Sequence, residues 1–157
     1  MIVVADTSPL NYLVLIGQVE LLPALYDRVL LPAEVHRELI RERSPAGVRE
    51  WAGDLPSWCE VRDVSTHADE ALSDLDRGER EAILLALESG VDTVLMDELE
   101  GRREAMRRNL RVTGTLGILE KAAQRGWIDF HDALRRLDMT NFRLSSELRH
   151  RFLNRPS

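Results

Sequence analysis

The sequence predicts an α/β fold in which a mostly parallel sheet is covered by helices on both faces. Short apolar segments of strand length alternate along the chain with longer segments whose apolar residues recur every three or four positions. The first apolar segment, IVVA, contains no polar residue, which is typical of a strand covered on both faces. Strands that alternate with helices in this way are joined by crossovers, and crossovers produce a parallel sheet.

Five segments are predicted to be strands because each is short and rich in apolar residues. IVVAD, RVLLP, VDTVLMD and LRVTG are largely apolar, whereas CEVRDV alternates between apolar and polar residues. In chain order the predicted strands cover residues 2–6, 28–32, 59–64, 91–97 and 110–114.

Helices are predicted between these strands from their start and stop signals. Ser8 followed by Pro9 is typical of an N-cap with proline in the first helical turn. Gly90 and Gly126 follow helical segments as C-terminal stops. The predicted helices cover residues 8–17, 19–27, 32–43, 68–76, 79–89, 99–109, 115–125, 127–138 and 145–155, with one more short helix between residues 45 and 58.

The length of 157 residues predicts one domain over residues 1–157, with the helices from about residue 129 packing on it or on a partner. The single Cys59 excludes an intramolecular disulfide, and no apolar run reaches the roughly 18 residues of a membrane span. We therefore expect a cytoplasmic protein that makes no membrane contact. The net charge of −6 argues against general nucleic-acid binding, although all but one of the 21 basic residues are arginine, which suits phosphate.

Two carboxylates directly follow predicted strands. Asp6 ends the first strand and Asp97 ends VDTVLMD. The carboxyl ends of parallel strands lie at one edge of a sheet, where ligands bind in such folds. Glu38 lies in the second turn of a predicted helix, and Glu79 lies at a helix start along the edge of a buried stripe. If these helices pack on the sheet, the four acids share one pocket.

Four carboxylates in one pocket repel one another and lose hydration, and divalent cations relieve both costs. Oxygen ligands without Cys or His select Mg²⁺ or Mn²⁺. Such ions activate water and stabilise the charge that develops on a phosphate, so the pattern points to phosphodiester hydrolysis. Each acid also has a structural explanation by itself, as a helix cap or a solvated helix residue.

Four segments in order resemble a PIN domain, and more narrowly its VapC-like branch, which has a DTSPL start and a GTLG segment. The segments are ADTSPLNYL, LLPAEVHREL, GEREAILLALESGVDTVLMDELEGRREA and VTGTLGILEKAAQRG, and the resemblance runs from residue 2 to about residue 145. It implies a three-layer α/β/α sandwich and an Mg²⁺- or Mn²⁺-dependent endoribonuclease. It further implies the toxin of a type II toxin–antitoxin pair, with RNA as substrate, a cognate antitoxin as partner and a homodimer as assembly.

Carried over by position, the resemblance implies that the catalytic and metal-binding acids are Asp6, Glu38, Glu79 and Asp97. Ser8 is the hydroxyl that often assists the metal site, and Glu79 stands where many relatives have aspartate. In the commoner pattern a threonine precedes the last acid by two residues, so Glu98 is held in reserve for Asp97.

Three further residues are weaker candidates for RNA binding. Arg103 and Arg107 lie one helical turn apart close to Asp97, and Thr115 follows Gly114 at a strand-to-helix turn whose amides suit phosphate. A solvated helix face and an ordinary helix cap explain them equally well or better.

Two other functions compete with the nuclease. A phosphatase with Asp6 as nucleophile would need a second aspartate at position 8 and a lysine near the phosphate. The chain has Ser8 at that position, and its only lysine, Lys121, lies inside a predicted helix. A non-catalytic metal- or protein-binding module with the same fold stays open.

Overall fold

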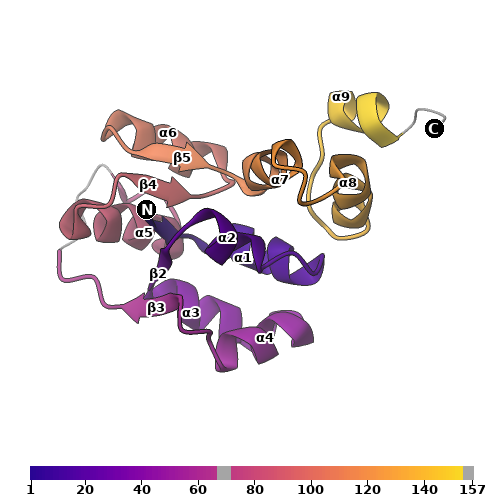
Figure 1. Ribbon diagram of the computed structural model, residues 1–157. Coiled ribbons are helices and arrows are strands. Elements are labelled where there is room, and N and C mark those ends of the chain that lie inside the picture. Colours follow the sequence, from indigo (N-terminus) through magenta and orange to yellow (C-terminus); the bar gives the residue numbers. More distant parts are fainter. Residues whose placement is uncertain (67–71, 154–157) are drawn as a thin grey trace.

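The computed structural model describes residues 1–66 and 72–153, which contain a five-stranded sheet with every neighbouring pair parallel (Figure 1). Its strands are β1 (Ile2–Ala5), β2 (Arg28–Pro32), β3 (Cys59–Arg62), β4 (Thr93–Leu95) and β5 (Arg111–Thr113). Their order across the sheet is β3-β2-β1-β4-β5. The predicted α/β/α fold is confirmed, and over the described residues the sheet is entirely rather than mostly parallel.

The helices in the described residues alternate with the strands. They are α1 (Thr7–Leu15), α2 (Leu21–Leu25), α3 (Ala33–Ile40), α4 (Ala46–Gly53), α5 (Arg77–Ser89), α6 (Leu99–Arg107), α7 (Thr115–Gln124), α8 (Phe130–Asp138) and α9 (Ser146–Leu148). A π-helical turn, Arg149–Leu153, follows α9. None of the helices in these residues has the length and hydropathy to cross a membrane.

Two hydrophobic cores lie on opposite faces of the sheet because successive side chains of a strand point to opposite faces. In β1, Val3 and Ala5 belong to the core that α1, α3, α7 and α8 cover, whereas Val4 belongs to the core that α5 and α6 cover. Both faces are therefore closed by helices, which explains why the first strand is apolar at every position.

The order of the strands places a topological switch point between β1 and β4. From β1 the chain moves outward through β2 to β3, then returns to the other side of β1 and continues through β4 to β5. Ligands bind outside the carboxyl ends of the strands at such a point. The backbone N–H of Asp6 donates to the carbonyl of Leu95 at 2.9 Å, so the two strand ends lie at the same edge.

Several predicted helix boundaries are wrong. The first helix begins at Thr7 and has Asp6, not Ser8, at its N-cap. The helix predicted over 32–43 ends at Ile40, where Arg41 turns to extended backbone and its guanidinium reaches back to Glu34. Residues 68–71 of the helix predicted over 68–76 lie outside the described residues, residues 73–75 form turns and a bend, and Asp76 is the extended N-cap of α5. In the helix predicted over 145–155, residues 146–153 form α9 and the π-helical turn, and residues 154–155 lie outside the described residues.

Candidate active site

Asp6 and Glu38 converge on the first turn of α5 at Gly78. Asp6 is 4% exposed, and although it occupies the N-cap of α1, its side chain makes no capping hydrogen bond. A Cβ atom added at Gly78 would lie 2.9 Å from Oε1 of Glu38 and 3.2 Å from Oδ1 of Asp6. Both distances are shorter than ordinary contact, so only glycine allows the helix to approach these carboxylates so closely. Thr7 also donates its hydroxyl to Oε2 of Glu38.

Glu79 is the next residue of α5 and is 6% exposed. Its backbone N–H donates to Oδ1 of Asp76 at 2.8 Å, and its own carboxylate accepts the backbone N–H of Asp76 at 3.3 Å. This reciprocal pair is a capping box, which fixes the start of the helix. The buried stripe of α5, which includes Ala82, Ile83 and Ala86, holds Glu79 inward, as its position at the edge of that stripe predicts.

The carboxylates of this group have raised pKa values, mainly because burial disfavours their charged forms. Burial raises the pKa of Asp6 well above its ordinary value, the N–H of Thr7 opposes the rise, and the negative charges of Asp76, Glu79 and Glu38 add to it. Burial also raises the pKa of Glu38, against the hydrogen bond from Thr7.

The pKa of Glu79 is raised by burial and then by the charge of Asp76 to about 7. The acids at this end of the sheet therefore oppose one another's ionisation. Such a group is stabilised by a positive charge placed among its oxygens.

Asp97 lies at the end of β4 in a different setting, because protein donors occupy both of its carboxylate oxygens. Its Oδ1 accepts the backbone N–H of Thr115 at 2.7 Å. Its Oδ2 accepts the hydroxyls of Ser8 at 2.6 Å and Thr115 at 2.7 Å. Asp97 thus connects the first turn of α1 with the first turn of α7, which fixes its orientation at the switch point.

The contacts of Thr115 correct one expectation. Thr115 is completely buried, and it gives both its N–H and its hydroxyl to Asp97. A residue without exposed surface and with its donors occupied is not available to RNA. Thr115 instead holds the carboxylate of Asp97. This carboxylate takes the N–H at the start of α7 that a phosphate would otherwise bind.

The arginines of α6 differ in their contacts. Arg103 and Arg107 do not line the cavities beside Asp97, and they form ion pairs with glutamates of their own helix, Glu100 at 3.3 Å and Glu104 at 2.9 Å. Arg102 instead faces the site. Its guanidinium donates to the carbonyl of Met96 at 3.2 Å, and a Cβ at Gly114 would lie 2.6 Å from its terminal nitrogen.

The reserve residue Glu98 also lies at this edge. It is the N-cap of α6 and is exposed, whereas Asp97 is half-buried. The charge of Glu98 adds to the effect of burial in raising the pKa of Glu79. Burial, and then the charges of Asp97 and Glu98, raise the pKa of Tyr12. The choice between Asp97 and Glu98 as the fourth acid stays open.

The structure places the carboxylates of Asp6 and Glu38 beside Gly78, with Glu79 next along α5 and Asp76 at the N-cap of that helix. Asp97 has its own set of hydrogen-bond donors. Within residues 1–66 and 72–153, no three His, Cys, Asp or Glu side chains stand close enough, as placed, to hold a metal ion jointly. The donors fit Mg²⁺ or Mn²⁺ in kind, because they are carboxylate and hydroxyl oxygens. Asp6 and Glu38 also point into one space beside Gly78.

Sequence reasoning missed three residues of the site. Asp76 was detectable, because an aspartate three residues before a glutamate is the sequence pattern of a capping box. Thr7 and Arg102 carry no such signal. Their contacts with Glu38 and with the carbonyl of Met96 depend on how α1 and α6 pack, which a local pattern does not reveal.

Comparison with known proteins assigns the family. A family model described as a PIN domain, DUF3368, matches residues 2–157. A search of curated proteins found no match to the chain.

Proposed function

The chain belongs to the PIN-domain family, and from this premise we propose that it is an Mg²⁺- or Mn²⁺-dependent endoribonuclease. PIN domains are typically metal-dependent nucleases, which supports a hydrolase in general. The observation that carries the finer proposal is the close approach of the Asp6 and Glu38 carboxylates beside Gly78, with Glu79 as the next residue of α5 and with raised pKa values for all three acids.

The residues that would hold the ion are Asp6, Glu38 and Glu79, with Asp97 or Glu98 completing the set. A bound divalent cation would supply positive charge to the scissile phosphate and lower the pKa of an attacking water molecule. The protein supplies the arrangement of the acids. Thr7 orients Glu38 through its hydroxyl, and Gly78 leaves the space in which Glu38 and Asp6 approach.

Ser8 and Thr115 act through Asp97 rather than on the phosphate. Both hydroxyls donate to Oδ2 of Asp97, and the Thr115 N–H holds Oδ1, so the carboxylate cannot rotate freely. Hydrogen bonds from neighbouring groups orient the ligands of metal sites in this way. A fixed carboxylate beside the acidic group keeps the site assembled between turnovers.

The direct test measures cleavage of single-stranded RNA with and without Mg²⁺. We expect the wild-type chain to cleave RNA with Mg²⁺ and not in EDTA. The cleavage rate of Asp6→Asn should be at least about 100-fold lower, because the loss of a metal ligand should cost more than the 10- to 100-fold effect of losing a residue that supports a ligand. Asp6→Asn should fold normally or be more stable, since it removes a repelling charge. Full activity in both Asp6→Asn and Asp97→Asn would refute the site. Metal binding without cleavage by the wild-type chain would favour the non-catalytic module.

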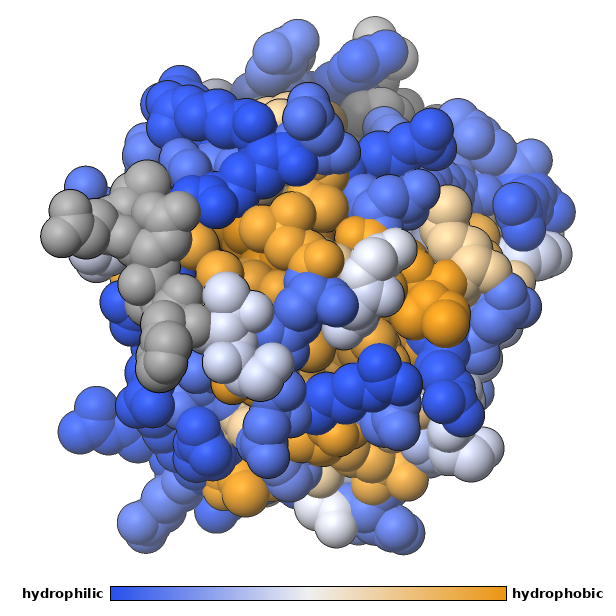
Figure 2. Space-filling model, turned by 90° about the vertical axis from the view of Figure 1, so that its left-hand side faces the viewer, coloured by the Kyte–Doolittle hydropathy of each residue, from blue (hydrophilic) through white to orange (hydrophobic). Residues whose placement is uncertain are grey.

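In the cell we propose that the protein is the toxin of a type II toxin–antitoxin pair and forms a homodimer. A contact surface is available on the side of the molecule where α5 and α6 lie, which carries a hydrophobic patch among charged side chains (Figure 2). Exposed large hydrophobic residues of these helices include Leu87 and Met106.

Expression of the chain by itself should arrest bacterial growth, and expression of Asp6→Asn should not. A neighbouring reading frame for a small DNA-binding protein would support the pair. Harmless overexpression of an RNA-cleaving wild-type chain would refute the toxin role while leaving the enzyme intact.

A further inference from the structure

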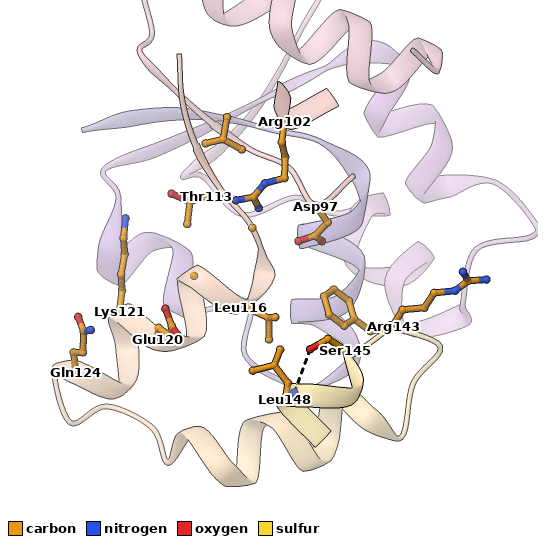
Figure 3. Close-up of a pocket in the computed structure, with 14 residues that line it drawn as sticks. Asp97, Arg102, Thr113, Leu116, Glu120, Lys121, Gln124, Arg143, Ser145 and Leu148 are labelled. Atoms are coloured by element: carbon orange, nitrogen blue, oxygen red, sulfur yellow. Dashed lines mark hydrogen bonds between the residues drawn. The ribbon is translucent and has the colours of Figure 1, made fainter. Parts of the chain in front are cut away.

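Two cavities flank Asp97 and share a wall from the segment between α8 and α9. The larger, about 700 Å³, lies between α7, β5 and this segment (Figure 3). The smaller, about 330 Å³, also contacts Ser8 and Tyr12 of α1. Asp97, Phe142 and Arg143 line both. The larger volume falls within the roughly 300–1,000 Å³ typical of ligand sites.

The larger cavity carries positive charge in a protein whose net charge is −6. Three cations line it, Arg102, Lys121 and Arg143, against two carboxylates. Figure 3 shows Arg102 at the top of the cavity, Lys121 at its left and Arg143 at its right edge, where the Arg143 side chain extends outward. In the part of the chain that the structure describes, none of the three forms an ion pair, whereas the arginines on the outer face of α6 do. Cations without a carboxylate partner retain donors for phosphate.

The same cavity has an apolar wall. Leu116, Phe142 and Leu148 line it, and the rings of Phe142 and Tyr12 form a T-shaped pair with centroids 4.9 Å apart. The contact with Tyr12 holds Phe142 in place beside Asp97. A fixed aromatic ring next to cationic side chains is the arrangement that binds single-stranded nucleic acid, where bases stack and phosphates pair with cations.

We propose that this cavity binds nucleotides of the single-stranded RNA next to the scissile bond, with a base on Phe142 and phosphates on Arg102, Lys121 and Arg143. The inference rests on the proposed nuclease function and assigns the side chains that contact the RNA strand beside Asp97. In this proposal the cations that line the cavity, rather than Arg103 and Arg107, contact the RNA phosphates.

The test measures fluorescence anisotropy of a labelled 12-nucleotide RNA without self-complementarity, on full-length protein carrying Asp6→Asn, in Mg²⁺. Adding Phe142→Leu should weaken binding roughly 5- to 100-fold, the loss expected for one stacked base. Adding Lys121→Gln or Arg143→Gln should each reduce the slope of log affinity against log salt by about 0.7, the value for one phosphate contact of a single strand.

Matched controls separate the cavity from general effects. Arg62→Gln removes an exposed arginine of β3 that pairs with Glu60, and Phe130→Leu truncates a partly buried ring that does not line the cavity. Both should bind as the Asp6→Asn parent does. A 12-base-pair RNA duplex should bind the parent at least about tenfold more weakly than the single strand.

A second measurement needs no cavity variant. RNA that contains 4-thiouridine should photo-crosslink to peptides from residues 112–124 or 141–148. Crosslinks confined to other segments, unchanged binding by the three cavity variants, or equal binding of the duplex would each overturn the inference.

Wild-type cleavage distinguishes this result from failure of the nuclease. If the wild-type chain cleaves RNA and the cavity variants bind normally, only the cavity is refuted. If it does not cleave and the cavity variants still lose binding, the nuclease fails and the RNA site stands.

Discussion

Replacing Glu79 with glutamine should stabilise the metal-free protein, and the gain should grow with pH. Glu79 is 6% exposed, and its pKa rises from 4.5 to about 7 on folding. Glutamine keeps an oxygen that can accept the N–H of Asp76 in the capping box, so the substitution removes the charge without removing the hydrogen bond.

The sign and size of the effect follow from proton linkage. The folded protein holds a proton on Glu79 more tightly than the unfolded chain does, so this group lowers the free energy of unfolding as pH rises from 4.5 toward 7. The full difference in pKa corresponds to about 3 kcal/mol above pH 7, of which most appears between pH 5 and pH 8. At about 2–4 °C per kcal/mol for a domain of this size, the Tm of Glu79→Gln should exceed that of wild type by roughly 6–12 °C at pH 8.

The assay is thermal denaturation in EDTA at pH 5 and pH 8, followed by circular dichroism. Glu100→Gln, which neutralises a carboxylate that is 76% exposed on α6, is the matched control and should show no such pH-dependent gain. A Glu79→Gln advantage that is absent at pH 8, or larger at pH 5 than at pH 8, would show that Glu79 is not the buried, repelled carboxylate described above.

Three further predictions concern the geometry of the site. Gly78→Ala should lower Mg²⁺-dependent cleavage at least about tenfold, because its methyl group would displace the Glu38 carboxylate 2.9 Å away. Gly47→Ala, whose methyl group would have no neighbour within 4 Å, should cleave as wild type does. Equal cleavage rates for the two variants would contradict the steric argument. Thr115→Val should cost about 1–3 kcal/mol in urea denaturation, since it removes the 2.7 Å hydroxyl donor to Asp97, and Thr115→Ser should restore most of that loss. Mg²⁺ at 100 times its dissociation constant should stabilise wild type by about 2.7 kcal/mol and Glu38→Gln by much less, and equal stabilisation of both would place the ion elsewhere.

Local sequence patterns were sufficient for the strands and most of the helices. The continuous apolar run at β1 predicted a strand covered on both faces, because a buried parallel strand has no exposed side to make polar. Asp6 and Asp97 could then be predicted at one edge, since the carboxyl ends of parallel strands coincide there. The helix boundaries were less accurate. Asp6 rather than Ser8 is the N-cap of α1, because the strand passes directly into the helix without an intervening turn.

The sequence by itself determined which acids lie at the carboxyl edge of the sheet. Hydrophobic periodicity and the succession of strands along the chain can be read from residues that are close together in the sequence. Only the tertiary structure decided how those acids are used. Gly78 meets Glu38 across 40 positions, and Ser8 meets Asp97 across 89. Contacts over such separations depend on how the helices pack. Helix packing therefore decided that Asp6 and Glu38 meet beside Gly78, whereas Asp97 is held separately by its own hydrogen bonds. The same packing buried Thr115 and turned Arg102, rather than Arg103 or Arg107, toward the cavity.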